Sequence, residues 1–257
     1  MFADGGFDFM VGNPPWVKLQ WKASDALADA DPQYAIHQQS ASDLNKVLPT
    51  ILGSSGSVRQ HFIGEYEAYA GQSSFFNAMG NYPLLQGQQT NLFRCFLPHA
   101  WDYTQQSDGV SAFIHPDEVY ADIKAGVLRE QMLKRLKYHF QFINEKRLFA
   151  EVHPNTVFSL NIYSNQNKDI IKFDSIWKLY LPVTIDECYS DTSGAPVQPM
   201  KTADNEWNTK GFSDRIIVID TSTLDTYVKL ANENVLSVSR APLFAVYAKR
   251  CCVHLSV

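Results

Sequence analysis

The chain has 257 residues, of which 45% are hydrophobic and 13% aromatic, so it can bury a substantial core as a globular protein. Its formal net charge of −5 is unexpected for a complete nucleic-acid-binding protein, which usually carries a basic groove for phosphates. The sequence shows no membrane-length apolar run, no signal-peptide pattern and no C-x-x-C spacing among Cys95, Cys188, Cys251 and Cys252, so we expect a reduced, cytoplasmic protein without a metal site.

The first informative stretch is the apolar run Phe7–Gly12, which predicts a buried strand and leads directly into Asn13-Pro14-Pro15-Trp16. Two consecutive prolines fix φ and remove two backbone donors, so the carbonyls of Asn13 and Pro14 face outward as acceptors. The Asn13 amide oxygen and the Pro14 carbonyl then form a cradle for an –NH₂ group, and an exposed Trp16 ring offers a planar base a stacking surface. The alternative is a proline-rich turn that ends a core strand, with Trp16 buried.

Residues 17–88 form a long connection rich in Ala, Ser, Gln and Gly. Ser42 or Asp43 would cap one helix, and the spacing over Phe62–Tyr69 predicts another. The run Gly53–Ser57 predicts a flexible break between them. A connection of this length inside a compact domain is usually functional.

The following elements alternate between helices and strands. Residues 90–104 predict a helix, Gly109–Ile114 a short strand, and Pro116–Lys137 a second helix. The alternation over Tyr138–Ile143 and Val157–Tyr163 predicts two strands joined by a short connection, which we expect to form an antiparallel hairpin at the edge of the sheet. Strands alternating with helices otherwise indicate a parallel sheet, so the expected fold class is α/β.

The remaining segments carry weaker signals. Trp177–Pro182 and Arg215–Asp220 predict short strands, and Ser190–Asn208 predicts a polar loop or linker. A basic cluster falls within the second predicted helix, where its spacing favours a solvated helix face over a track for phosphates: Lys124, Arg129, Lys134, Arg135 and Lys137.

The stretch Phe7–Trp16 resembles the catalytic motif of amino-group methyltransferases that use S-adenosylmethionine (SAM), in which Asp, Asn or Ser precedes Pro-Pro and an aromatic residue. The Asn-Pro-Pro-aromatic form is similar to that of DNA adenine-N6 methyltransferases, and it also occurs in some RNA methyltransferases and in enzymes that methylate a glutamine side chain. The resemblance covers about residues 1–165 and implies the C-terminal half of a Rossmann-like class I methyltransferase fold, with an insertion at about 17–88. Residues 166–257 would form a linker and the start of a further region.

The resemblance implies roles for the motif residues. Asn13 and the Pro14 carbonyl would accept hydrogen bonds from the N6 amine of an adenine that has left the base stack. Trp16 would stack on that base, and Pro15 would hold the turn rigid. Alignment and electrostatics would do most of the catalytic work, so no strong general base is required.

The resemblance also implies a second stacking surface, near the end of the domain. The stretch Glu151–Asn155 is similar to a motif in which an aromatic residue precedes the proline, and His153 occupies that position here. Phe149 is the alternative stacking residue, and a surface-turn role is the alternative for His153.

Further site residues follow from the same resemblance and from strand ends. Asn91 and Phe93 match the helix that flanks the cofactor in the family, although a place in the core is the preferred alternative for Phe93. His115 and Asp117 follow a predicted strand at the end where open α/β sheets bind ligands, so they would line the substrate cleft. A helix-capping role for Asp117 is the alternative.

The glycine-rich turn that binds SAM in the family is missing. Asp4-Gly5-Gly6 lies directly before the catalytic strand, and Gly53–Gly56 has no strand ahead of it. A permuted arrangement would need such a turn within residues 165–257, where none is found. We therefore expect a fragment, a truncated reading frame or one subunit of a split enzyme, with the SAM-binding half on an upstream polypeptide.

The leading hypothesis is a site-specific DNA adenine-N6 methyltransferase of the restriction-modification or phage-defence type, inactive alone, with SAM as methyl donor and DNA as partner. The first alternative is an RNA or protein-glutamine amino methyltransferase, against which the long insertion counts. The second is a non-catalytic remnant or an interaction subunit, which the missing glycine-rich turn favours. Neither a membrane nor a metal ion is an expected partner.

Overall fold

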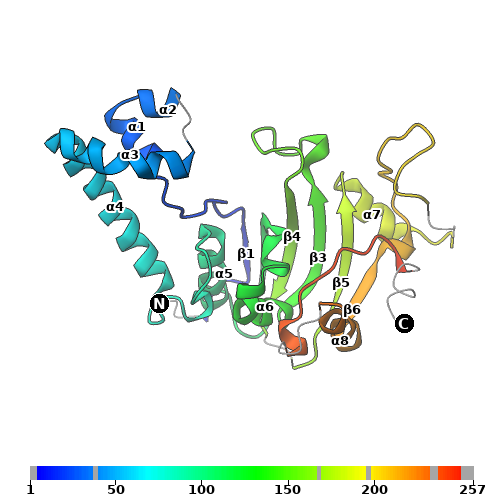
Figure 1. Ribbon diagram of the computed structural model, residues 1–257. Coiled ribbons are helices and arrows are strands. Elements are labelled where there is room, and N and C mark those ends of the chain that lie inside the picture. The colour runs from blue at the N-terminus through cyan, green and yellow to red at the C-terminus, as the bar shows by residue number, and fades with distance from the viewer. Residues whose placement is uncertain (1–4, 37–39, 167–168, 195–197, 232–236, 250–257) are drawn as a thin grey trace. The chain divides into compact units, whose positions relative to one another are not determined.

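A computed structural model describes residues 5–36, 40–166, 169–194, 198–231 and 237–249 (Figure 1). The chain divides into two compact units, and we call Met1–Trp16 with Phe93–Val257 unit 1 and Val17–Leu92 unit 2. In none of the described ranges is a helix both long enough and apolar enough to cross a membrane.

The elements in chain order are β1 (Phe9–Gly12), α1 (Ala23–Ala30), α2 (Gln33–Ile36), α3 (Ala41–Ser54), α4 (Gly56–Asn77), η1 (Pro83–Leu85), α5 (Leu92–Tyr103), β2 (Val110–Pro116), η2 (Asp117–Tyr120), η3 (Ile123–Ala125), α6 (Gly126–Leu133), β3 (Leu136–Ile143), η4 (Asn144–Lys146), β4 (Val157–Ser164), β5 (Lys172–Leu179), α7 (Val183–Ser190), η5 (Ser213–Arg215), β6 (Ile217–Asp220), α8 (Thr221–Leu230) and η6 (Val238–Arg240).

Unit 1 is built on a six-stranded sheet with the order β1-β2-β4-β3-β5-β6. β1 pairs with β2 and β3 pairs with β5 in parallel, whereas β4 is antiparallel to both of its neighbours and β6 is antiparallel to β5. The predicted α/β class and the predicted antiparallel hairpin are therefore confirmed. The hairpin does not form an edge, because β4 lies between β2 and β3 and the sheet continues through β5 and β6.

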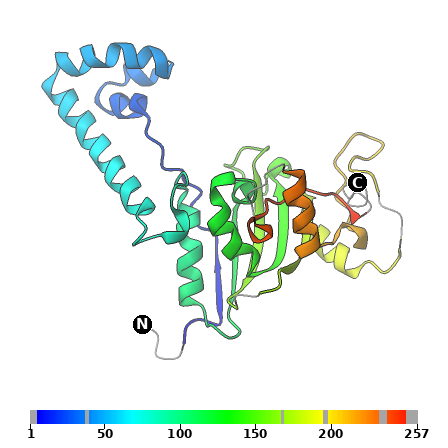
Figure 2. The same cartoon turned by 60° about the horizontal axis from the view of Figure 1, so that its bottom comes forward.

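The alternation of side chains along the strands gives the sheet two different faces. One face, which we call the aromatic face, carries Phe158, Phe140, Phe142 and Ile176, and these pack with Cys188 of α7. The opposite face, which we call the polar face, carries buried polar side chains from β2, β4, β3 and β5: Ser111, His115, Ser159, Asn161, His139, Gln141 and Ser175. α6 and α8 both pack against η6, and both views place them on the same side of the sheet (Figure 1, Figure 2).

The first strand forms where it was predicted, but the prediction that it is buried is wrong. Phe9 is 75% exposed and Val11 is 81% exposed. β1 is the outermost strand and pairs only with β2, so its other edge has no strand beside it among the described residues. Hydrophobicity alone identified the strand, but whether a strand is covered depends on the elements packed around it.

The single helix predicted over Pro116–Lys137 is instead divided into η2, η3 and the short helix α6. The carboxylate of Asp122 accepts a hydrogen bond from the backbone N–H of Lys124 at 2.9 Å and so begins a new turn. This local capping competes with a continuous helix, as is usual for Asp.

The prediction of a solvated basic face is wrong for Arg129, which has no exposed surface. Its guanidinium donates to three backbone carbonyl oxygens, those of Arg240 at 2.7 Å, Asp122 at 2.6 Å and Val119 at 3.2 Å. Arg129 therefore ties η6 to the turns before α6, and it is not available to bind phosphate.

Unit 2 consists of α1 to α4 and η1. Ser40, rather than Ser42 or Asp43, is the N-cap of α3, and its hydroxyl accepts from the backbone N–H of Asp43 at 3.2 Å. The predicted break at Gly53–Ser57 contains the junction of α3 and α4, where Ser55 caps both helices. The core of this unit is formed by Ala26, Leu27, Leu44 and Phe62.

The segments after the hairpin continue the same sheet. β5 begins five residues before the predicted Trp177–Pro182 strand, and β6 confirms the strand predicted at Arg215–Asp220. The expected boundary near residue 165 thus falls between two strands of one sheet. Cys95 and Cys188 are buried free thiols, while Asp4, Cys251 and Cys252 lie outside the described residues.

Candidate active site

The segment Asn13–Trp16 begins where β1 ends, at the carboxyl end of two parallel strands. The register pairs Gly12 of β1 with Phe113 of β2, so Asn13 emerges beside the last residues of β2. The loop between β3 and β4 reaches the same edge, because Phe158 of β4 pairs with Pro116 of β2. This is the edge at which open α/β sheets place their ligands.

The Trp16 ring is half-buried and held by three contacts. Its indole Nε1 donates a hydrogen bond to the backbone carbonyl of Ile114 at 3.3 Å. Its ring lies edge-on to Phe149, with centroids 5.5 Å apart, and tilted against Phe158 at 5.7 Å. The sequence allowed either an exposed or a buried Trp16 ring. The structure shows an intermediate case, because the ring packs on the edge of the aromatic face.

Asn144 fixes the loop that brings Phe149 to Trp16. Its side-chain nitrogen donates to the carbonyls of Phe149 at 2.9 Å and Val152 at 2.8 Å, and its side-chain oxygen accepts from the Phe149 N–H at 3.0 Å. Asn144 has no exposed surface. Sequence reasoning missed it, and the only available signal was a polar residue directly after the apolar strand β3.

The two prolines and Asn13 differ in exposure. Pro14 is buried, while Asn13 and Pro15 are exposed. Within the described part of the chain, the Asn13 side chain has no hydrogen-bond partner. Its amide is therefore available to a ligand, three residues before the half-buried Trp16.

His153 lies in a surface turn. The ring Nδ1 of this exposed residue accepts from the backbone N–H of Asn155 at 3.2 Å, and its carbonyl accepts from the N–H of Thr156 at 2.9 Å. The structure brings Phe149, rather than His153, against Trp16. These contacts favour the surface-turn interpretation of His153.

His115 belongs to a buried network on the polar face. Its Nδ1 lies 2.9 Å from the Pro116 carbonyl and therefore donates, which leaves Nε2 as an acceptor. Nε2 receives hydrogen bonds from the amide of Asn161 and the hydroxyl of Tyr163, both at 3.0 Å. Burial lowers the pKa of His115 from 6.5 to about 4, so the ring is neutral near pH 7. His115 has no exposed surface and does not line an open cleft here.

Asp117 forms a chain of hydrogen bonds with His139 and Ser175. Asp117 Oδ1 lies 2.9 Å from His139 Nε2, and His139 Nδ1 lies 2.9 Å from Ser175 Oγ. Burial by itself would raise the pKa of Asp117, but the charge and hydrogen bond of His139 and the amide of Gln141 lower it below its usual value. The order Asp-His-Ser is that of a nucleophilic triad. Because Ser175 has no exposed surface, this arrangement cannot reach a substrate and stabilises the polar face instead.

The two residues expected to contact SAM are also buried. Phe93 has no exposed surface and stacks on the ring of His115, with centroids 4.9 Å apart. Asn91, in unit 2, is 2% exposed, and its backbone bridges to Lys18. The structure places Phe93 in the core, which was the alternative to a contact with SAM.

No family model matches the chain, and no curated protein matches it. Several solved structures are similar to part of it. The methyltransferase subunit of a type I restriction-modification system from Streptococcus thermophilus is 15% identical over 68% of this chain and 27% of that chain, with a TM-score of 0.34. A modification subunit of a putative type I restriction enzyme from Vibrio vulnificus YJ016 is 16% identical over 57% and 31%, with a TM-score of 0.37.

A third similar structure is the M protein of the type I restriction enzyme EcoKI, at 12% identity over 65% of this chain and 41% of that chain, with a TM-score of 0.35. The chain thus spans less than half of the length of these three solved proteins. Such partial similarities leave the function to be argued from the site itself.

Proposed function

We propose that Asn13–Trp16 is the target-base site of a SAM-dependent DNA adenine-N6 methyltransferase of the restriction-modification or phage-defence type. The observation that carries this proposal is the pairing of an exposed, unpartnered Asn13 amide with a Trp16 ring held in place at the carboxyl edge of the sheet. Together they suit a planar base that carries an exocyclic amine.

In this site the chain binds and orients the amine. The Asn13 side-chain oxygen and the Pro14 carbonyl accept the two hydrogens of N6, which concentrates electron density on the nitrogen and directs its lone pair outward. Trp16 contacts the face of the base, and Phe149 supports Trp16 from the loop side. The base must first leave the duplex stack, because N6 is inaccessible inside a duplex. His115 takes no part in proton transfer in this scheme, since it is buried and neutral.

The residues described here do not fit a complete SAM site. Phe93 is occupied by its contact with His115, and Asn91 is almost fully buried. We therefore assign no step of methyl transfer to cofactor contacts within this chain, and we propose that a partner polypeptide supplies the surface that binds SAM.

The open edge of β1 supports a partner at this position. An outer strand with free N–H and C=O groups is a template for pairing with another strand. Phe9 and Val11, both more than two-thirds exposed, present an apolar surface beside that edge. A partner that adds a strand to this edge would stand next to Asn13.

The proposal is tested by measuring whether this chain alone, without the partner or SAM, binds a base that carries an exocyclic amine more tightly than one that lacks it. The full chain, with its tryptophan indoles labelled with ¹⁵N, is titrated with single-stranded hexamers of deoxyadenosine or of deoxynebularine, a purine nucleoside that lacks the exocyclic amine. Phosphate contacts are equal for the two hexamers, so they cancel in the comparison. The Trp16 signal is assigned from the variant Trp16→Phe.

The expected result is a saturable shift of the Trp16 signal that needs a lower concentration of the deoxyadenosine hexamer. Asn13→Ala should weaken this preference about tenfold, the share of one hydrogen bond of about 1.4 kcal/mol, whereas Asn155→Ala, at an exposed asparagine in the loop between β3 and β4, should keep it. Equal binding of the two hexamers by the native chain would refute amine recognition by this site.

A further inference from the structure

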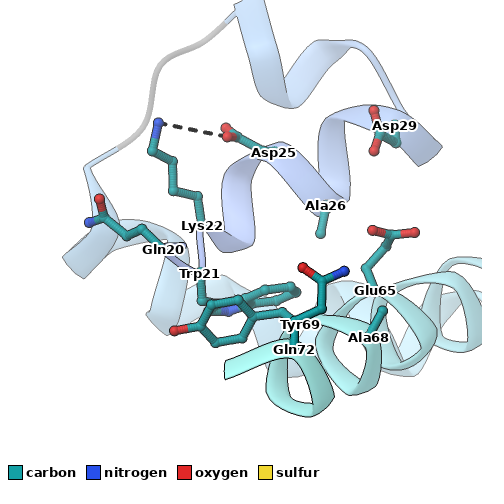
Figure 3. A pocket seen from close by; sticks show the side chains of 10 residues that line it. All are labelled: Gln20, Trp21, Lys22, Asp25, Ala26, Asp29, Glu65, Ala68, Tyr69 and Gln72. Atoms are coloured by element: carbon teal, nitrogen blue, oxygen red, sulfur yellow. Dashed lines mark ion pairs between the residues drawn. The ribbon is translucent and has the colours of Figure 1, made fainter. Parts of the chain in front are cut away.

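A pocket of about 240 Å³ lies in unit 2, between α1 and α4 (Figure 3). One water molecule takes ~30 Å³ in the liquid, so the pocket has room for a group of several heavy atoms. It is formed wholly by residues of unit 2, and neither the site at Asn13 nor the proposed methyl transfer uses it.

One wall of the pocket is a single face of α4. Glu65, Ala68, Tyr69 and Gln72 follow the spacing i, i+3, i+4 and i+7, which places them on the same side of the helix. Ala68 is exposed and small, so the space beside it stays open. The other wall is α1, where Asp25 and Asp29 at i and i+4 flank the small residue Ala26 (Figure 3).

Aromatic rings form the end of the pocket near Trp21. The ring of Trp21 lies 5.8 Å from that of Tyr69 and 5.2 Å from that of Tyr66. Phe62, in the core of the unit, packs edge-on against Trp21 at 5.3 Å and fixes its orientation. Aromatic faces attract cations through the electrostatic quadrupole of the ring.

The rim of the pocket is negatively charged. Lys22 lies 3.8 Å from Asp25, and its ammonium is drawn beside that carboxylate, away from Asp29 and Glu65 (Figure 3). Among the described residues, neither Asp29 nor Glu65 forms an ion pair. Asp29 is also in the last turn of α1, where the helix dipole disfavours a negative charge, and it repels Asp25 four residues before it. A cation bound in the pocket would relieve this repulsion.

We propose that this pocket binds an organic cation, a guanidinium or ammonium group, between the ring of Trp21 and the carboxylates of Asp29 and Glu65. The same chemistry is offered by a small free cation and by an arginine or lysine side chain of a partner protein. An open pocket with aromatic and acidic walls suits both, because the cation keeps part of its hydration while it contacts the ring.

The test uses the full chain with ¹⁵N-labelled indoles and follows the Trp21 signal, assigned from Trp21→Phe. The probes are millimolar guanidinium ion, the blocked peptide acetyl-Gly-Arg-Gly-amide and neutral urea, at constant ionic strength because exposed charges are screened by salt. Both cationic probes should give saturable shifts, and urea should give none. A lower dissociation constant for the peptide than for guanidinium would assign the site to a protein side chain. Equal dissociation constants for the two probes would assign it to a free cation.

Variants separate binding in the pocket from general charge effects. Asp29→Asn and Glu65→Gln should each raise the dissociation constant at least fivefold, and Ala68→Met should abolish the shift by filling the space. Glu67→Gln is the matched control, because Glu67 is an exposed carboxylate on the same helix that does not line the pocket. Shifts caused equally by urea, the absence of saturation, or an equal loss of binding in Glu67→Gln would overturn the proposal. The indole signals of the other four tryptophans, unchanged in each variant, verify that it is folded.

Discussion

Asn144→Ala tests whether one buried amide holds the loop that positions Phe149 against Trp16. The substitution removes three hydrogen bonds, two to carbonyls and one from a backbone N–H, all between 2.8 and 3.0 Å. A typical intramolecular hydrogen bond contributes ~1 kcal/mol net, so three of them give a loss of about 3 kcal/mol in the free energy of unfolding of unit 1. The cost falls within the range of mutations that break a buried network.

The free energy of unfolding is measured by urea denaturation, with the Trp16 indole signal followed in parallel. Trp16 should also change its signal in the native state, because Phe149 no longer packs on it. Asn155→Ala, in the same loop but exposed, is the control and should change the stability by less than about 0.5 kcal/mol. A loss below about 1 kcal/mol in Asn144→Ala, with an unchanged Trp16 signal, would show that the loop is held by other contacts.

Two further predictions concern the buried groups of unit 1. Arg129→Met should lower the free energy of unfolding by about 3–5 kcal/mol, because it removes the fully buried donor of hydrogen bonds to three backbone carbonyls, whereas Lys124→Met at an exposed position should change it little. Similar losses in thermal unfolding of the two variants would contradict this. The folded-state pKa of His115 is about 4, below its ordinary 6.5, so the unfolded chain binds the proton more readily and stability falls as the pH falls between these values. This costs about 2 kcal/mol at pH 5 relative to pH 7, and an equally steep pH dependence in His115→Gln would exclude His115 as the cause.

Local signals in the sequence were sufficient for several elements of unit 1, but they did not predict α7 or α8. The apolar run before Asn13, the alternating strands of the hairpin and the helix predicted at 90–104 each depend on neighbouring residues, and each is present. The helix predicted over Pro116–Lys137 was wrong because Asp122 provides a competing local cap.

The interactions that sequence reasoning missed are those made by pairing distant strands. Asp117, His139 and Ser175 come from η2, β3 and β5, and only the register of the sheet brings them together. Arg129 looks like a surface residue in the sequence, because its acceptor on Arg240 lies far along the chain. The exposure of Phe9 and Val11 could likewise not be predicted, since the sequence of an apolar strand is the same whether or not another element covers it.

The central claim is that Asn13 recognises the exocyclic amine of an extruded adenine. The most direct measurement is the ratio of the dissociation constants of the deoxynebularine and deoxyadenosine hexamers, compared between the native chain and Asn13→Ala. One well-made hydrogen bond of about 1.4 kcal/mol corresponds to a tenfold preference. With Asn13 and the Pro14 carbonyl each accepting one hydrogen of N6, the native ratio should be about one hundred, and Asn13→Ala, which keeps the Pro14 acceptor, should lower it to about ten. A ratio that is the same in both proteins would contradict the claim.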